Sequence, residues 1–209
     1  MGISVNDSKL AELARLIEEW PGLVSAPADE LIEDCLVLVS HVSDATTLVD
    51  VGSGGGLPGL ALKIMVPRLA VTLVEADGRK AAFLTQACAR LGLPGVRVVD
   101  RRAEDAAHDA GLREAFDVAV ARALAPMPVL AELCLPFVRV GGRLLAQKTR
   151  DEDLSAAGRA IELLGGGPLQ IEPAPSKARR SGIVVVVEKV GPTPQAYPRR
   201  AGVPARRPL

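Results

Sequence analysis

The sequence predicts an α/β fold in which helices cover a mostly parallel sheet. Three observations indicate it: short apolar segments alternate with amphipathic ones from residue 47 onward, a glycine-rich turn follows the first apolar segment, and two apolar segments close the series. Strands that alternate with helices form parallel sheets in βαβ units. The 209 residues suffice for one domain with appendages, and an apolar fraction of 48% is enough to build a core.

The elements can be assigned in order along the chain. Helices are expected at residues 6–20 and 28–43, where apolar residues recur at helical spacing. Seven strands follow, and the last two are expected to pair, which makes one late strand antiparallel. The strands are expected at 47–51, 71–75, 96–99, 117–121, 143–147, 169–171 and 183–190, with helices at 60–65, 78–91, 128–135 and 154–164.

Three segments follow from this assignment. Residues 1–45 form an N-terminal helical cap, residues 46–190 form the domain of alternating strands and helices, and residues 191–209 form a basic arm rich in Pro and Arg. The arm is expected to be an extended tail or a clamp.

Composition excludes several classes of protein. No segment approaches the ~18 apolar residues of a membrane span, and the acidic start does not resemble a signal peptide, so a cytoplasmic location is expected. The three cysteines, Cys35, Cys88 and Cys134, are far apart and are expected to be small buried residues. His41 and His108 are equally isolated, so no metal site is expected.

The formal net charge of zero conceals an uneven distribution. Residues 171–209 contain eight Lys or Arg and two Glu, whereas residues 1–170 contain 17 basic and 23 acidic residues. A basic segment on an acidic body is typical of chains that contact a polyanion.

The glycine-rich turn at residues 52–59 lies between a strand and a helix, where glycines let a ligand approach the backbone. It matches GxGxxG but not a Walker A loop. Asp50 ends the first strand, where a dinucleotide fold normally has an apolar residue. Glu75 ends the second, where a carboxylate accepts ribose hydroxyls. The pair favours S-adenosylmethionine, which is cationic, over NAD.

The chain resembles one family in several motifs. These are VDVGSGGGLPGL at residues 49–60, AED at 103–105, VARA at 120–123 and YPRRAGVPARRPL at 197–209. Together they resemble the GidB/RsmG family, which methylates N7 of a guanine in 16S ribosomal RNA, and the likeness runs from about residue 46 to 209. The resemblance implies a Rossmann-like class I methyltransferase fold and an enzyme that converts S-adenosylmethionine to S-adenosylhomocysteine.

The resemblance also implies roles for individual residues. Arg122 and Lys148, at the ends of two strands, are expected to position the guanine, and Arg122 also to steady the cofactor. Cofactor contacts are expected at Asp50, Gly52, Gly54, Gly56, Leu57, Glu75, Ala103, Glu104 and Arg122.

The arm is expected to bind RNA. Phosphate contacts are assigned to Arg199, Arg200, Arg206 and Arg207. Five aromatic residues are too few for a multi-base stacking platform, so phosphate contacts around one held guanine fit better. The expected partner is 16S ribosomal RNA or a small-subunit precursor, bound by a monomer. Residues 28–40 lack the family's basic or histidine-containing motif, which leaves an RNA contact there open.

The expected reaction needs little from the side chains. Guanine N7 carries a lone pair and no proton, so no general base is required, and alignment alone can contribute ~7–11 kcal/mol. Three alternatives remain: a methyltransferase for another substrate, an NAD-binding oxidoreductase, and a non-catalytic RNA-binding module.

Overall fold

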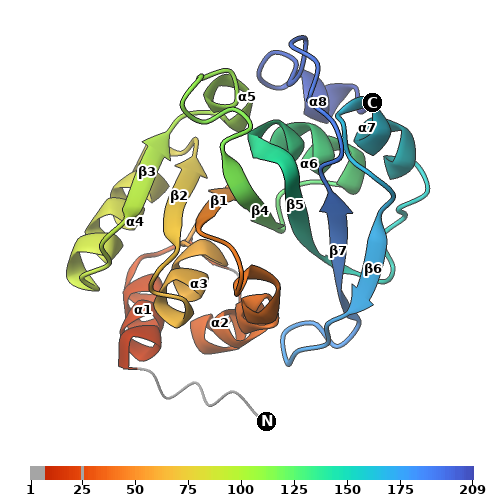
Figure 1. Ribbon diagram of the computed structural model, residues 1–209. Helices are drawn as coiled ribbons and strands as arrows, with labels where there is room; N and C mark the ends of the chain where they lie inside the picture. Colours follow the sequence, from red (N-terminus) through yellow and green to blue (C-terminus); the bar gives the residue numbers. More distant parts are fainter. Residues whose placement is uncertain (1–7, 25) are drawn as a thin grey trace.

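The computed structural model describes residues 8–24 and 26–209, which form one seven-stranded sheet covered by helices (Figure 1). The strand order is β3-β2-β1-β4-β5-β7-β6. Strands β1 to β5 are parallel where they pair, and β7 is antiparallel to both β5 and β6. The predicted fold class is confirmed. The strands are β1 Thr47–Val51, β2 Ala70–Glu75, β3 Val96–Asp100, β4 Phe116–Arg122, β5 Val138–Thr149, β6 Gln170–Pro173 and β7 Gly182–Glu188.

Helices lie on both faces of the sheet, and each face has its own apolar core. The first face is covered by α1 Ser8–Glu19, α2 Ala28–Leu36, α3 Gly59–Met65 and α4 Gly78–Arg90. The second face is covered by α5 Ala103–Ala106, α6 Met127–Cys134 and α7 Ala157–Leu163. Short 3-10 helices at Val39–Val42 (η1) and Leu135–Phe137 (η2) and a last helix, α8 Val203–Arg206, complete the fold.

The alternation of side chains along each strand divides the residues between the two cores. Leu48 packs with the first-face helices, whereas its neighbour Val49 packs with the second-face helices. This period of two is inherent in extended backbone. It decides which strand-end residues can meet, because residues an odd number apart lie on opposite faces.

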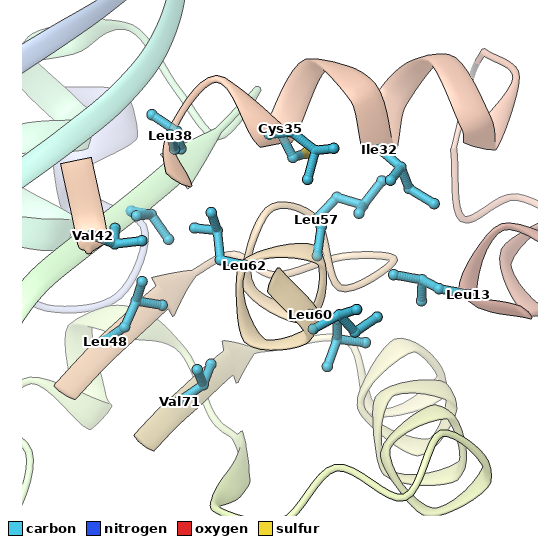
Figure 2. Close-up of a cluster of buried hydrophobic side chains, with 14 of the residues drawn as sticks. Leu13, Ile32, Cys35, Leu38, Val42, Leu48, Leu57, Leu60, Leu62 and Val71 are labelled. Atoms are coloured by element: carbon cyan, nitrogen blue, oxygen red, sulfur yellow. The ribbon is translucent and has the colours of Figure 1, made fainter. Parts of the chain in front are cut away.

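The N-terminal helices share the core of the domain that follows them. Leu13 of α1 and Ile32 of α2 lie beside Leu60 of α3 in one buried cluster (Figure 2). Trp20 lies edge-on to Phe83 of α4, with ring centroids 5.5 Å apart. The cap is therefore packed onto the first face of the sheet as part of the same core.

The C-terminal arm folds back on the domain as a clamp. Arg113 donates hydrogen bonds to the carbonyl oxygens of Thr193 at 2.8 Å and Tyr197 at 2.9 Å. The Nε2 atom of His108 lies 2.8 Å from the carbonyl oxygen of Pro198. The arm is therefore folded against the domain and is not extended away from it.

The cysteines and the second helix agree only in part with the sequence predictions. Cys35 and Cys134 are buried, as predicted, whereas Cys88 is only partly buried. The predicted helix at 28–43 ends at Leu36, and a separate 3-10 turn replaces its last part. In the part of the chain that the structure describes, no helix is long and apolar enough to cross a membrane, and no three His, Cys, Asp or Glu residues form a group suited to a metal ion.

Candidate active site

Two cavities of about 400 Å³ each lie at the carboxyl ends of β1, β2 and β4. Such crevices are where open α/β sheets bind their ligands, and 300–1,000 Å³ is a typical volume for a small-molecule site. The first cavity is bounded by Glu75, the start of α5 and part of the C-terminal arm. The second is bounded by the α1–α2 connection and Arg122. Gly52 and Gly54 line both, so the glycine turn lies where the two cavities meet.

The Glu75 carboxylate is held in place at the wall of the first cavity. The backbone N–H of Gly54 donates to Oε2 at 2.8 Å, and that of Asp77 donates to Oε1 at 2.9 Å. Gly54 has a φ of +54°, which glycine adopts without strain. A Cβ at this position would meet only the carbonyl oxygen of Gly52, at 3.9 Å. The turn therefore orients the carboxylate while its own backbone stays accessible from the cavities.

Gly56 and Leu57 of the turn lie differently with respect to the two cavities. Gly56 lines neither cavity. A Cβ there would collide with Leu60 and lie 3.2 Å from Leu84, so its role is close packing, which corrects the expected cofactor contact. The Leu57 side chain points into the buried cluster with Ile32 and Leu60 (Figure 2). Leu57 still lines the second cavity.

Asp50 is buried beneath the glycine turn. Its Oδ2 atom accepts a hydrogen bond from the backbone N–H of Gly59 at 2.9 Å, and Oδ1 is buried without a partner among the described residues. Burial raises the pKa of Asp50 to about 7, against the lowering effect of the Gly59 hydrogen bond. The residue lines neither cavity, so the predicted contact with a ligand is not direct in this structure.

Ala103 and Glu104, at the start of α5, both line the first cavity. The Oε1 atom of Glu104 accepts a hydrogen bond from the backbone N–H of Gly202 at 2.8 Å. Glu104 is predicted only as a cofactor contact. In the structure its Oε1 atom also holds the C-terminal arm.

Arg122 ends β4 and lines the second cavity. Its Nε atom donates to Oδ2 of Asp34, 3.1 Å away on α2. Arg179 donates to the same carboxylate at 2.8 Å and Ser176 at 2.5 Å. Burial opposes ionisation of this carboxyl, but hydrogen bonds from Arg179 and Ser176 outweigh it and hold the pKa of Asp34 below its usual value.

Asp34 is a site residue that the sequence interpretation missed. It is completely buried, and its neighbours Leu31, Cys35 and Leu38 form the inward stripe of this part of the chain. A carboxylate on such a stripe is rarely tolerated without a cationic partner. That signal was available in the sequence, although the identity of the partners was not.

Lys148 lies at the carboxyl end of its strand, as predicted, but its side chain does not point to the same side of the sheet as that of Arg122. In the β4–β5 register Arg122 faces Gln147, so Lys148 projects from the opposite face of the sheet. Its ammonium group is buried there and donates to the carbonyl oxygen of Ala125 at 2.5 Å and to Glu152 at 2.8 Å. Lys148 lines neither cavity and fixes the loop that follows β4.

Gln147 takes the place beside Arg122 that was assigned to Lys148. Its side-chain N–H donates to the backbone carbonyl oxygen of Asp34 at 2.8 Å, and its Oε1 atom is buried without a partner in the described part of the chain. The first-face rim therefore consists of Arg122, Gln147 and the α2 carboxylate.

The four arginines of the arm fall into two groups. Arg199 donates to buried Glu132 from Nε at 2.8 Å and from Nη2 at 2.5 Å, so the predicted phosphate contact at Arg199 is corrected to a structural ion pair. The pKa of Arg199 is raised by these hydrogen bonds. Arg200, Arg206 and Arg207 are exposed and remain candidates for phosphate contacts.

Further cations at the first cavity were not predicted. Lys80, Arg101 and Arg102 all line it, and the two arginines are exposed. They come from the starts of α4 and α5, which the topology brings to the same edge of the sheet. A single charged residue at a helix start carries no signal in sequence, so this basic rim becomes visible only in the fold.

Comparisons with known proteins agree on one family. The family profile described as GidB, rRNA small subunit methyltransferase G, matches residues 23–181. A protein of Chloroflexus aggregans named ribosomal RNA small subunit methyltransferase G is 46% identical, and the alignment covers 100% of this chain and 93% of that protein. A protein of the same name from Moorella thermoacetica is 45% identical over 83% of this chain and 74% of its own length.

A solved structure supports the fold. The O-methyltransferase TomG from Streptomyces achromogenes, in complex with SAM, superposes with a TM-score of 0.60 over 88% of this chain and 91% of that chain. Its sequence identity is 17%, so this likeness concerns the fold alone.

Proposed function

The chain belongs to the GidB family of small-subunit ribosomal RNA methyltransferases, and from that premise we propose that it transfers a methyl group from S-adenosylmethionine to N7 of a guanine in 16S ribosomal RNA. S-adenosylhomocysteine is the second product. The observation that carries the proposal is the Glu75 carboxylate, oriented by two backbone N–H groups beside an accessible glycine turn.

The first cavity suits the nucleoside part of the cofactor. Glu75 lines it from the end of β2, where a carboxylate accepts ribose hydroxyls. Val74, Leu124, Val129 and Leu133 supply apolar surface around it. Ala103 offers backbone at the rim. This combination of one oriented acceptor and apolar walls fits an adenosine group.

The second cavity suits the methionine part. Arg122 supplies a cation for a carboxylate group, and the backbone of Gly52 and Gly54 continues the path from the first cavity. Asp50 lies behind this turn, where it accepts the hydrogen bond from the backbone N–H of Gly59 and does not line the cavity. When bound, the cofactor supplies an activated methyl group, so the protein needs no nucleophile or metal of its own.

The residues of the chain then serve to align two reactants. Guanine N7 needs no deprotonation, and holding it in line with the methyl group can contribute ~7–11 kcal/mol. The loop 123–126 follows Arg122 and contributes to both cavities. The ion pair of Lys148 and Glu152 holds this loop in place on its buried side. Ala123 in this loop has a φ of +52°, a conformation that costs of order 1 kcal/mol in a non-glycine residue and is typical of functional sites. We propose that this loop receives the target base.

The basic rim suits the RNA backbone. Arg101, Arg102 and the arm residues Arg200, Arg206 and Arg207 are exposed on elements that bound the first cavity. Such cations position a nucleic acid through its phosphates without reading its sequence. We propose that the substrate is 16S ribosomal RNA, free or within an assembling subunit.

Transfer of a labelled methyl group tests the proposal. Purified protein incubated with methyl-labelled S-adenosylmethionine and unmodified 16S ribosomal RNA or small subunits is expected to label the RNA. Arg122→Ala is expected to reduce the rate strongly while the circular dichroism spectrum is retained. Absence of label with every form of the substrate, or undiminished transfer by Arg122→Ala, would overturn the assignment.

A further inference from the structure

The C-terminal arm contributes directly to the first cavity. Gly202 and Ala205 line it together with Glu75 and Ala103, although nearly 100 residues separate the arm from α5. Figure 1 shows α8 next to α6, near the edge of the sheet at which α5 also lies. The family resemblance assigns cofactor contacts to the turn, α5 and the end of β4, and assigns the arm to RNA.

The arm is anchored at two carboxylates. Buried Glu132 of α6 accepts three hydrogen bonds from Arg199, two from the guanidinium and one from the backbone N–H at 2.8 Å. Glu104 accepts one from the backbone N–H of Gly202 at 2.8 Å. A buried carboxylate is stable only when it is paired in this way, so the arm returns to one fixed place over the cavity.

The arm presents different surfaces to the cavity and to solvent. Toward the cavity it offers Gly202 and Ala205, which carry no charge, next to the apolar residues Val129 and Leu133. Its arginines at 206 and 207 are exposed. A wall of small, uncharged residues suits the flat apolar face of a purine ring.

We propose that the arm is a wall of the cofactor site, in which Ala205 contacts the adenine end of S-adenosylmethionine and S-adenosylhomocysteine, and that Glu132 and Arg199 are positioning residues that seat it. This inference rests on the proposed function. It gives the arm a role in cofactor binding that is separate from any contact with RNA.

Two matched substitutions in the full-length chain test the inference. Both Ala201 and Ala205 are exposed, but only Ala205 lines the cavity, so Ala205→Trp places a large side chain there and Ala201→Trp places the same side chain on the arm away from it. Calorimetric titration with S-adenosylhomocysteine is expected to show Kd raised about tenfold or more by Ala205→Trp, because the indole takes up space in the cavity that the ligand needs. Ala201→Trp is expected to leave Kd unchanged. Equal Kd values for wild type and Ala205→Trp would contradict the inference.

Hydrogen exchange in the wild-type protein provides a second test that needs no substitution. S-adenosylhomocysteine is expected to slow amide exchange in residues 199–206 as well as in the glycine turn. Protection of the turn alone would overturn the role of the arm and leave the proposed function intact, because the cofactor would still bind. Failure of the wild-type protein to bind S-adenosylhomocysteine would instead overturn the proposed function.

Discussion

The Oδ2 atom of Asp34 lies 3.1 Å from Nε of Arg122 and 2.8 Å from Nε of Arg179. One buried carboxylate on α2 thus joins the end of β4 to the connection between β6 and β7. The N-terminal cap belongs to the site for this reason, although its helix carries no basic motif. Arg122 reaches the second cavity with its guanidinium already oriented by this ion pair.

Asp34→Asn is expected to lower both stability and methyl transfer. Asparagine keeps the shape but removes the charge that two guanidinium groups share, and breaking a buried ion pair costs about 3–5 kcal/mol. Urea denaturation and the KM for S-adenosylmethionine measure the two effects. Glu33→Gln is the control, because Glu33 is only half-buried and its pair with exposed Lys177, at 3.6 Å, is worth about 1 kcal/mol or less. Equal behaviour of the two variants would show that Asp34 has no special role.

Lys148→Met is expected to act on stability more than on chemistry. It leaves Glu152 and the carbonyl oxygen of Ala125 without their buried donor, which costs about 1–3 kcal/mol in unfolding free energy. The rate of methyl transfer per folded molecule is expected to remain above that of Arg122→Ala. A folded Lys148→Met protein as inactive as Arg122→Ala would instead support a direct role of Lys148 in methyl transfer.

Arg199→Ala is expected to destabilise the fold, because it removes the guanidinium that pairs with the buried Glu132 carboxylate and keeps only the backbone hydrogen bond of the three. The expected loss is about 3–5 kcal/mol of unfolding free energy. Thermal and urea unfolding measure it. Glu132→Gln combined with Arg199→Met removes both charges and is expected to recover much of the loss. An Arg199→Ala protein of wild-type stability would show that the ion pair does not anchor the arm.

Replacement of Arg200, Arg206 and Arg207 together by alanine is expected to weaken RNA binding without loss of stability, since all three are exposed. Each lost phosphate contact reduces the slope of log K against log salt by about 0.7–1. A salt titration of RNA binding measures the slope for the triple variant and for wild type. Identical slopes would exclude the arm from the RNA interface.

Asp50→Asn is expected to change how stability depends on pH. The pKa of Asp50 is raised from 3.8 to about 7, so between these values the folded state holds a proton that the unfolded state lacks. Wild-type stability then decreases as pH rises through this window, by up to about 1.4 kcal/mol per pH unit from this group. Asparagine does not titrate. The stability of Asp50→Asn relative to wild type should therefore rise from pH 4 to pH 8. If the two proteins gave parallel curves of unfolding free energy against pH, a buried Asp50 with a raised pKa would be contradicted.

The regular elements could be predicted because their local signals agree with the fold. The helix expected at 78–91 is observed at Gly78–Arg90, with the Asp77 side chain accepting from the N–H groups of Arg79 and Lys80. All seven predicted strands are present in the structure, because a short apolar segment between two helices rarely forms anything other than a buried strand. Helix α8 was not predicted, because a four-residue segment with a proline at its second position gives no helical periodicity in the sequence, and its start is fixed by the hydrogen bond from Gly202 to Glu104.

The site could be predicted only in part, and the reason differs between residues. The side chain of Lys148 was assigned to the wrong face of the sheet. Side chains alternate between the two faces of a strand, so its face follows only once the register of β4 with β5 is known, which pairs Arg122 with Gln147. Arg199 and Arg200 are adjacent identical residues, and only the fold places Glu132 next to one of them. The local sequence contains no signal for an ion pair between residues that are far apart in the chain.

The central claim is the methylation of guanine N7 in 16S ribosomal RNA, and one measurement tests it most directly. Unmodified 16S ribosomal RNA or small subunits are incubated with the protein and S-adenosylmethionine, digested with a nuclease, and analysed by mass spectrometry. One fragment is expected to gain a single methyl group, located by fragmentation on the base of a guanosine at N7. A methyl group on another atom or another base, or no gain in mass in any fragment, would contradict the claim.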